Sequence, residues 1–268
     1  LVAKGALVAT RSLASAGVPE SLRSLAGDWF EHDRIGFVSV PAEWSAAMLA
    51  HAALHTLDLN EELLRHGYLL KDATPANILF EGSRPVFVDV PSIEPLQAGQ
   101  NLWLARHQFE TTFLLPLLAV LDAGYPLQWS LADPARGLSH EQLAKMFGPR
   151  RWLSADRIRH VALAAALGGT GAAGRNTGAA ASGGGRNDVE KSRFILSHSL
   201  QGLRKAMEKL AARIEQRHSH WSAYAVSRAH YADADLQAKR DFVERVVQRA
   251  GARWVLDVGA NTGEFCEM

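Results

Sequence analysis

Residues 254–265 read Trp-Val-Leu-Asp-Val-Gly-Ala-Asn-Thr-Gly-Glu-Phe. The first five form an apolar run typical of a buried strand, and the glycine turn at 259–263 favours the start of a helix. A strand that enters a helix through such a turn is the first half of a nucleotide-type α/β unit. We therefore expect a parallel α/β sheet at this end of the chain.

The positions of the glycines indicate which ligand the turn suits. Glycine lets backbone N–H groups approach a ligand, because no side chain holds them away. The dinucleotide fingerprint requires glycine at 259, 261 and 264, but Asn261 and Glu264 occupy two of these positions. A pyrophosphate ligand is therefore disfavoured.

The turn resembles the first motif of class I S-adenosylmethionine-dependent methyltransferases, which have a Rossmann-like α/β fold. The resemblance implies that the acid preceding the turn lies near the cofactor's ammonium group. It also implies that the methionine part of S-adenosylmethionine is surrounded by Asp257, Gly259, Asn261 and Gly263. A strand and tight turn in some other α/β domain is the alternative.

Residues upstream of the turn resemble the lead-in of a bacterial group related to nodulation-protein methyltransferases. The residues that carry this resemblance are Trp221, Tyr224, Tyr231 and Lys239. The chain begins with Leu and ends five residues after Gly263. We expect a fragment of a longer enzyme, truncated after the first cofactor motif and inactive alone. The resemblance places the ribose-binding acid and the acceptor site beyond the end, so the catalytic residue for methyl transfer and the methyl acceptor stay unknown.

Composition narrows the remaining function classes. The chain has 268 residues, 47% hydrophobic and 21% charged, with a net charge of +1, as in soluble globular proteins. So small a net charge provides no general attraction for nucleic acid or an anionic membrane. There is no 18-residue apolar run and no signal-peptide pattern, so we expect a cytoplasmic protein without membrane association. Cys266 alone builds neither a disulfide nor a zinc site.

A composition break divides the chain. Eight of the eighteen residues at 168–185 are glycine, and this segment cannot bury enough apolar surface to fold. We expect a flexible linker at 168–187 between a first domain at 1–167 and a second at 188–268. The fold class predicted is α+β for the first domain and α/β for the second.

The first domain carries a spaced set of polar residues. Asp72 is followed five residues later by Asn77, and Asp89 follows two short strands. In a catalytic loop of this kind one carboxylate accepts a hydroxyl proton, while an Asn amide oxygen and a second carboxylate hold Mg²⁺ against ATP phosphates. The spacing resembles that of protein-kinase-like and aminoglycoside-phosphotransferase-like folds. The resemblance implies that Asp72 is catalytic and that Asn77 and Asp89 bind magnesium.

This sequence departs from the kinase pattern. Lys71 stands where Arg or Gly commonly precedes the aspartate, and Val90 follows Asp89 in place of Phe. A glycine-rich phosphate loop and the nucleotide-binding lysine are missing. Three interpretations stay open: a small-molecule phosphotransferase, a non-catalytic pseudokinase scaffold that binds a partner, and chance turn-forming aspartates.

Periodicity gives the remaining elements. Strands are predicted at 34–40, 68–70, 78–80, 85–90 and 253–258, and helices at 43–57, 61–66, 104–123, 139–147, 154–167 and 235–250. A further helix carries an apolar stripe formed by Leu196, Leu200, Leu203, Met207, Leu210 and Ile214. The stripe favours packing on the chain's own domain, with self-association as the alternative.

Two pairs of histidines are further possible metal ligands. Each pair is close in sequence, but neither has an evident third ligand, so packing or surface roles are favoured over a metal site. The pairs are His51 with His55 and His218 with His220.

Overall fold

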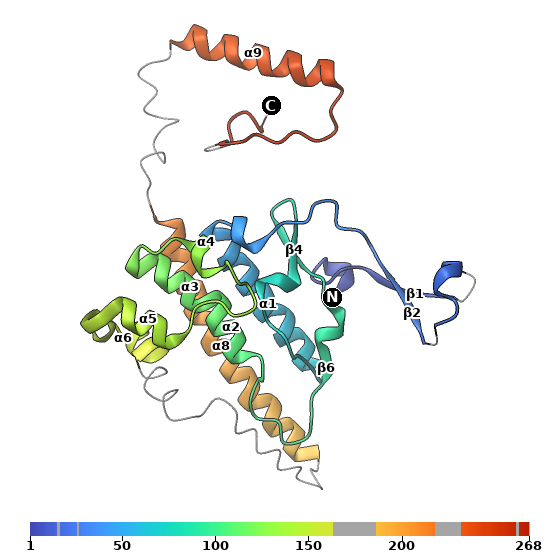
Figure 1. Cartoon of the computed structure of the whole chain (residues 1–268), viewed down its shortest axis with the longest axis vertical. Coiled ribbons are helices and arrows are strands. Elements are labelled where there is room, and N and C mark those ends of the chain that lie inside the picture. The colour runs from blue at the N-terminus through green and yellow to red at the C-terminus, as the bar shows by residue number, and fades with distance from the viewer. Residues whose placement is uncertain (15–16, 26, 163–185, 218–231, 261–262, 268) are drawn as a thin grey trace. The chain divides into compact units, whose positions relative to one another are not determined.

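The computed structural model describes residues 1–14, 17–25, 27–162, 186–217, 232–260 and 263–267 (Figure 1). The chain forms two compact units, Leu1–Glu215 and Gln216–Met268. The first unit therefore includes the helix at 186–215, which the sequence analysis assigned to the second domain. Most of the proposed linker, residues 168–185, lies outside the described residues.

Helix α1 (Ala46–Arg65) is the centre of the first unit. The Ser45 hydroxyl caps its first turn, accepting from the Met48 N–H at 3.2 Å. The sequence predicted two helices here, but the apolar face continues through Leu59 without a glycine or proline to interrupt it, so the helix is unbroken. It ends at Arg65, and Gly67, two residues later, has a φ of 82°, the left-handed conformation that stops a helix.

Helix α8 (Arg186–Glu215) packs along α1. Figure 1 shows it beneath the other helices of this unit. Five members of its apolar stripe are buried and the sixth, Ile214, is partly buried against the core. The prediction that the stripe packs on its own domain is confirmed. These side chains are already buried in the core of the first unit, and self-association through the stripe stays an untested prediction.

A strand predicted at 34–40 does not form. The hairpin near the amino end instead joins β1 (Thr10–Leu13) to β2 (Trp29–His32) in antiparallel register. The run after β2 has β-forming residues but no partner strand, and the Phe37 side chain is 69% exposed. Strand formation needs backbone partners as well as propensity, which explains the error.

Two further strand pairs lie at the middle of this unit. β3 (Tyr68–Leu70) pairs antiparallel with β6 (Ile93–Pro95), and β4 (Ile78–Glu81) pairs antiparallel with β5 (Arg84–Phe87). The strands predicted at 68–70 and 78–80 are confirmed. β5 ends at Phe87 although the prediction ran to 90, because the next residues enter the turn η6 (Val90–Ser92).

Helices cover the rest of the unit. The helix predicted at 104–123 runs through four consecutive segments, and the one predicted at 139–147 begins with a Ser139 capping box. The α- and π-helical segments are α2 (Arg106–Phe109), η7 (Glu110–Leu114), α3 (Leu115–Leu118), η8 (Ala119–Ala123), α4 (Leu127–Ser130), α5 (His140–Phe147), α6 (Ala155–Arg157) and η10 (Ile158–Ala162). Further 3-10 turns are η1 (Val2–Lys4), η3 (Glu20–Leu22), η4 (Pro41–Glu43), η5 (Pro75–Asn77) and η9 (Gly148–Trp152).

The second unit contains α9 (Asp233–Ala250), close to the helix predicted at 235–250. The strand predicted at 253–258 is absent: Trp254 is 92% exposed and Leu256 is 86% exposed, with no paired strand beside them. All strand pairs in the described ranges are antiparallel. The mixed α+β class is therefore confirmed, whereas the expected parallel sheet does not form among these residues.

Within the described ranges, no helix combines the length and apolar character that crossing a bilayer requires.

Candidate functional sites

The loop that carries Asp72 is fixed at several points. It follows β3, and its Lys71 N–H donates to the Ser92 carbonyl oxygen at 2.8 Å. The Ala73 N–H donates to Oε1 of Gln108 at 2.6 Å. Further along, the Thr74 hydroxyl accepts from the Ala76 N–H at 3.2 Å. The loop therefore has a defined backbone path toward η5.

The Asp72 side chain is half-buried on this loop. It has no hydrogen bond or ion pair with any residue that the structure describes. A carboxylate on an anchored backbone with its oxygens uncommitted can accept a proton from a substrate hydroxyl. The catalytic role that the kinase resemblance implies for Asp72 stays a prediction.

Asn77 and Asp89, predicted as a pair, lie together. The Asn77 Nδ2 group donates to Oδ2 of Asp89 at 3.3 Å. The same carboxylate oxygen accepts a short hydrogen bond from the Ser92 hydroxyl, and Asn77 Nδ2 lies 3.5 Å from Ser92 Oγ. The hairpin of β4 and β5 brings the two predicted residues together, because Asn77 precedes one strand and Asp89 follows the other.

Ser92 was missed by the sequence analysis. Its side chain is fully buried, and it contacts both predicted residues. The only local signal is its position three residues after Asp89, a spacing that many ordinary turns share.

The oxygen atoms around Asn77 and Asp89 are of the kind that magnesium binds, but there are few of them. The described residues contain no group of three or more His, Cys, Asp or Glu side chains that could hold a metal. Mg²⁺ is commonly bound by one or two protein carboxylates together with substrate phosphates and water. Asp89 therefore offers a carboxylate of the kind that magnesium takes together with phosphates, whereas the Asn77 amide turns its Nδ2 group toward that carboxylate.

His51 and His55 belong to no metal-binding cluster among the residues that the structure describes. Burial lowers the pKa of His55, whose Nε2 atom lies 2.8 Å from the Ala6 carbonyl oxygen, as in a packed histidine. The second pair, His218 and His220, lies outside the described residues, as do Trp221, Tyr224 and Tyr231 of the methyltransferase lead-in.

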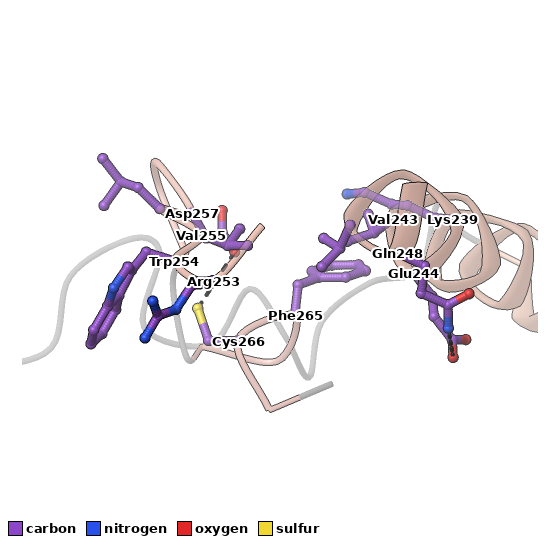
Figure 2. Close-up of a pocket in the computed structure, with 12 residues that line it drawn as sticks. Lys239, Val243, Glu244, Gln248, Arg253, Trp254, Val255, Asp257, Phe265 and Cys266 are labelled. Carbon is purple, nitrogen blue, oxygen red and sulfur yellow. Dashed lines mark hydrogen bonds between the residues drawn. The ribbon is translucent and has the colours of Figure 1, made fainter. Parts of the chain in front are cut away.

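A hollow of about 610 Å³ lies within the second unit (Figure 2). One side is formed by α9, and the other by residues 253–257 with Phe265 and Cys266. Asp257 is half-buried on this wall, and the Cys266 thiol lies 3.9 Å from its Oδ2 atom. The lining is mostly apolar and carries two carboxylates, Asp257 and Glu244, and two cations, Lys239 and Arg253.

The glycine turn follows residues 253–257 in sequence, and neither Gly259 nor Gly263 lines the hollow. Gly259 and Gly263 both have a φ of 80°, a conformation that residues with side chains rarely adopt. A Cβ atom at either glycine would meet no other atom within 4 Å, so the turn is not crowded by the protein itself. Asn261, the fourth predicted cofactor residue, lies outside the described ranges. The structure thus places Asp257, Gly259 and Gly263 along one short segment.

Comparison with known proteins finds a nodulation relative. The chain is 32% identical to "Nodulation protein NoeA" of Rhizobium meliloti (strain 1021) over 240 residues, which is 88% of this chain and 48% of NoeA. The chain spans about half the length of this curated relative. Because 88% of the chain exceeds the extent of Leu1–Glu215, the similarity continues into the second unit.

No model of a known protein family matches the chain. No solved structure matches it either.

Proposed function

We propose that the protein expressed from the complete reading frame, called the full-length protein below, is an S-adenosylmethionine-dependent methyltransferase. The observation that carries the proposal is the half-buried Asp257 beside an uncrowded turn with glycines at positive φ. The resemblance of residues 255–265 to the first class I methyltransferase motif supplies the cofactor. Similarity to NoeA reaches into both units and is compatible with this proposal, and the relative's name gives no reaction.

The residues of the turn fit the amino-acid end of the cofactor. The Asp257 carboxylate offers an acceptor for the ammonium group, and burial strengthens this charge-assisted contact. No side chain crowds Gly259 or Gly263, which leaves room beside them for the cofactor's carboxylate, although the Gly263 N–H already donates to the Ala260 carbonyl oxygen at 2.9 Å. When bound, S-adenosylmethionine supplies an electrophilic methyl group for in-line transfer, and the protein contributes by orienting the reactants. The acceptor is left open.

Isothermal titration of the full-length protein with S-adenosylmethionine tests the proposal. We expect measurable binding that falls at least about 10-fold in Asp257→Asn, because the ammonium group loses a charged partner. The matched control is Asp233→Asn, an exposed acid at the start of α9, which should bind like the wild type. Absence of binding by the wild type would contradict the proposed function.

The Asn77–Asp89 hydrogen bond favours a second candidate function for the first unit. We propose that this unit binds magnesium and a nucleotide, with Asp72 as the proton acceptor of a small-molecule phosphotransferase. The predicted metal ligands are in contact, and the predicted catalytic carboxylate lies on an anchored loop. A pseudokinase scaffold would keep the same contacts without the transfer reaction.

Magnesium-dependent ATP binding distinguishes these alternatives. We expect binding that requires Mg²⁺ and is lost in Asp89→Ala, whereas the exposed control Asp28→Ala leaves it unchanged. Binding that persists in Asp72→Ala but without phosphate transfer supports the catalytic role of Asp72. ATP binding that Asp89→Ala does not alter would refute the metal assignment.

A further inference from the structure

Two neighbouring cations of α9 hold the segment that follows the glycine turn. The Arg240 guanidinium forms an ion pair with the Glu264 carboxylate, and these side chains are 40% and 23% exposed. One position earlier, Lys239 Nζ lies 4.9 Å from the centre of the Phe265 ring. Figure 2 shows Phe265 pointing toward α9 beneath Lys239. Consecutive residues on the helix therefore contact consecutive residues after the turn.

These contacts matter because burial fixes little else among the described residues of the second unit. α9 has no buried residue, and Trp254 and Leu256 lie mostly in solvent. An ion pair or cation–π contact at a partly exposed site is individually weak. Acting on adjacent residues, the two contacts together restrict a turn whose positive-φ glycines give it unusual backbone freedom.

The positions of the two contacts show which residues of the turn they restrain. Glu264 comes immediately after Gly263, and the backbone there continues in a turn through the Cys266 N–H to Gly263 carbonyl hydrogen bond of 2.8 Å. Cys266 in turn lies beside the Asp257 carboxylate. Fixing Glu264 against α9 thus fixes both the last glycine and the approach of the segment to Asp257.

We propose that Arg240, assisted by Lys239, is a positioning residue for the cofactor site, acting through Glu264 on the glycine turn. This inference rests on the proposed methyltransferase function, since it assigns a role toward the same S-adenosylmethionine. Arg240 is absent from the walls of the hollow, which separates its effect from direct contact with the ligand. Lys239 does line the hollow, so a substitution there would not separate direct contact with the ligand from positioning of the turn.

The test measures S-adenosylmethionine affinity and amide hydrogen exchange in the full-length protein. In Arg240→Ala we expect the Kd to rise about 3- to 10-fold. We also expect faster exchange of the amides at 263–266, with an unchanged thermal midpoint. Arg240→Lys keeps the charge and should restore most of the affinity. The double variant Arg240→Glu with Glu264→Arg exchanges the two charges, and it should bind S-adenosylmethionine more tightly than either single variant.

Arg245→Ala removes another exposed arginine from the same helix and is the matched control. If the wild type binds S-adenosylmethionine and Arg240→Ala has the same affinity and the same amide exchange, the positioning role is overturned and the methyltransferase proposal stands. No binding by the wild type would overturn both. An equal loss in Arg245→Ala, or no recovery in the exchanged pair, would also contradict an ion pair that acts through Glu264.

Discussion

Truncating Leu200 tests the packing of α8 on α1. Its side chain is fully buried in the core of the first unit. Leu200→Ala removes three carbon groups, and at about 0.8 kcal/mol for each the lost transfer free energy is about 2.4 kcal/mol. The cavity left behind adds to this cost, so we expect the free energy of unfolding to fall by about 3–4 kcal/mol.

Urea unfolding followed by far-ultraviolet circular dichroism provides the assay. The matched control is Phe194→Ala on the same helix, because its side chain is 74% exposed and should change stability by less than about 0.5 kcal/mol. The midpoint for Leu200→Ala should not depend on protein concentration, since its partner is α1 of the same chain. An unchanged midpoint, or a concentration-dependent loss, would refute the packing described here.

Two further predictions concern stability. Burial alone would raise the pKa of Asp122, but hydrogen bonds from Arg157 and Arg213 bring it below its usual value. The ionised form therefore stabilises the fold above pH about 4 and this contribution is lost at lower pH. Asp122→Asn should cost about 2 kcal/mol at pH 7 and less at pH 3, measured by urea unfolding; an equal cost at both values would contradict this. Gly137 has a φ of 60°, and a Cβ there would lie 2.1 Å from a backbone carbonyl oxygen of η7. Gly137→Ala should thus lower the thermal midpoint far more than Gly99→Ala, which has a similar φ and open space; equal shifts would rule out the clash.

Local signals in the sequence predicted several elements well. The strand at 68–70 has the predicted bounds, and Ser139 begins α5 because its cap depends only on residues of the first turn. Asn77 and Asp89 lie within hydrogen-bond distance, since a tight hairpin joins the strands between them, and their magnesium role stays a prediction. In each case the determining contacts are close in sequence.

Contacts between distant segments were harder to predict. Residues 34–40 and 253–258 have strand-forming composition, but composition does not say whether a neighbouring strand is present. The apolar stripe of α8 indicated a packed face without identifying α1 as its partner. Ser92 was missed because a buried hydroxyl carries no pattern of its own; its importance comes from contacts with Asn77 and Asp89.

The central claim is that the glycine turn admits the amino-acid end of S-adenosylmethionine. The most direct measurement is calorimetric titration of the full-length protein and its Gly263→Trp variant with this cofactor. Because the turn is uncrowded and Gly263 has a positive φ, an indole there would both strain the backbone and fill the space beside it. We predict binding by the wild type and none by the variant. Equal binding by the two proteins would contradict the assignment.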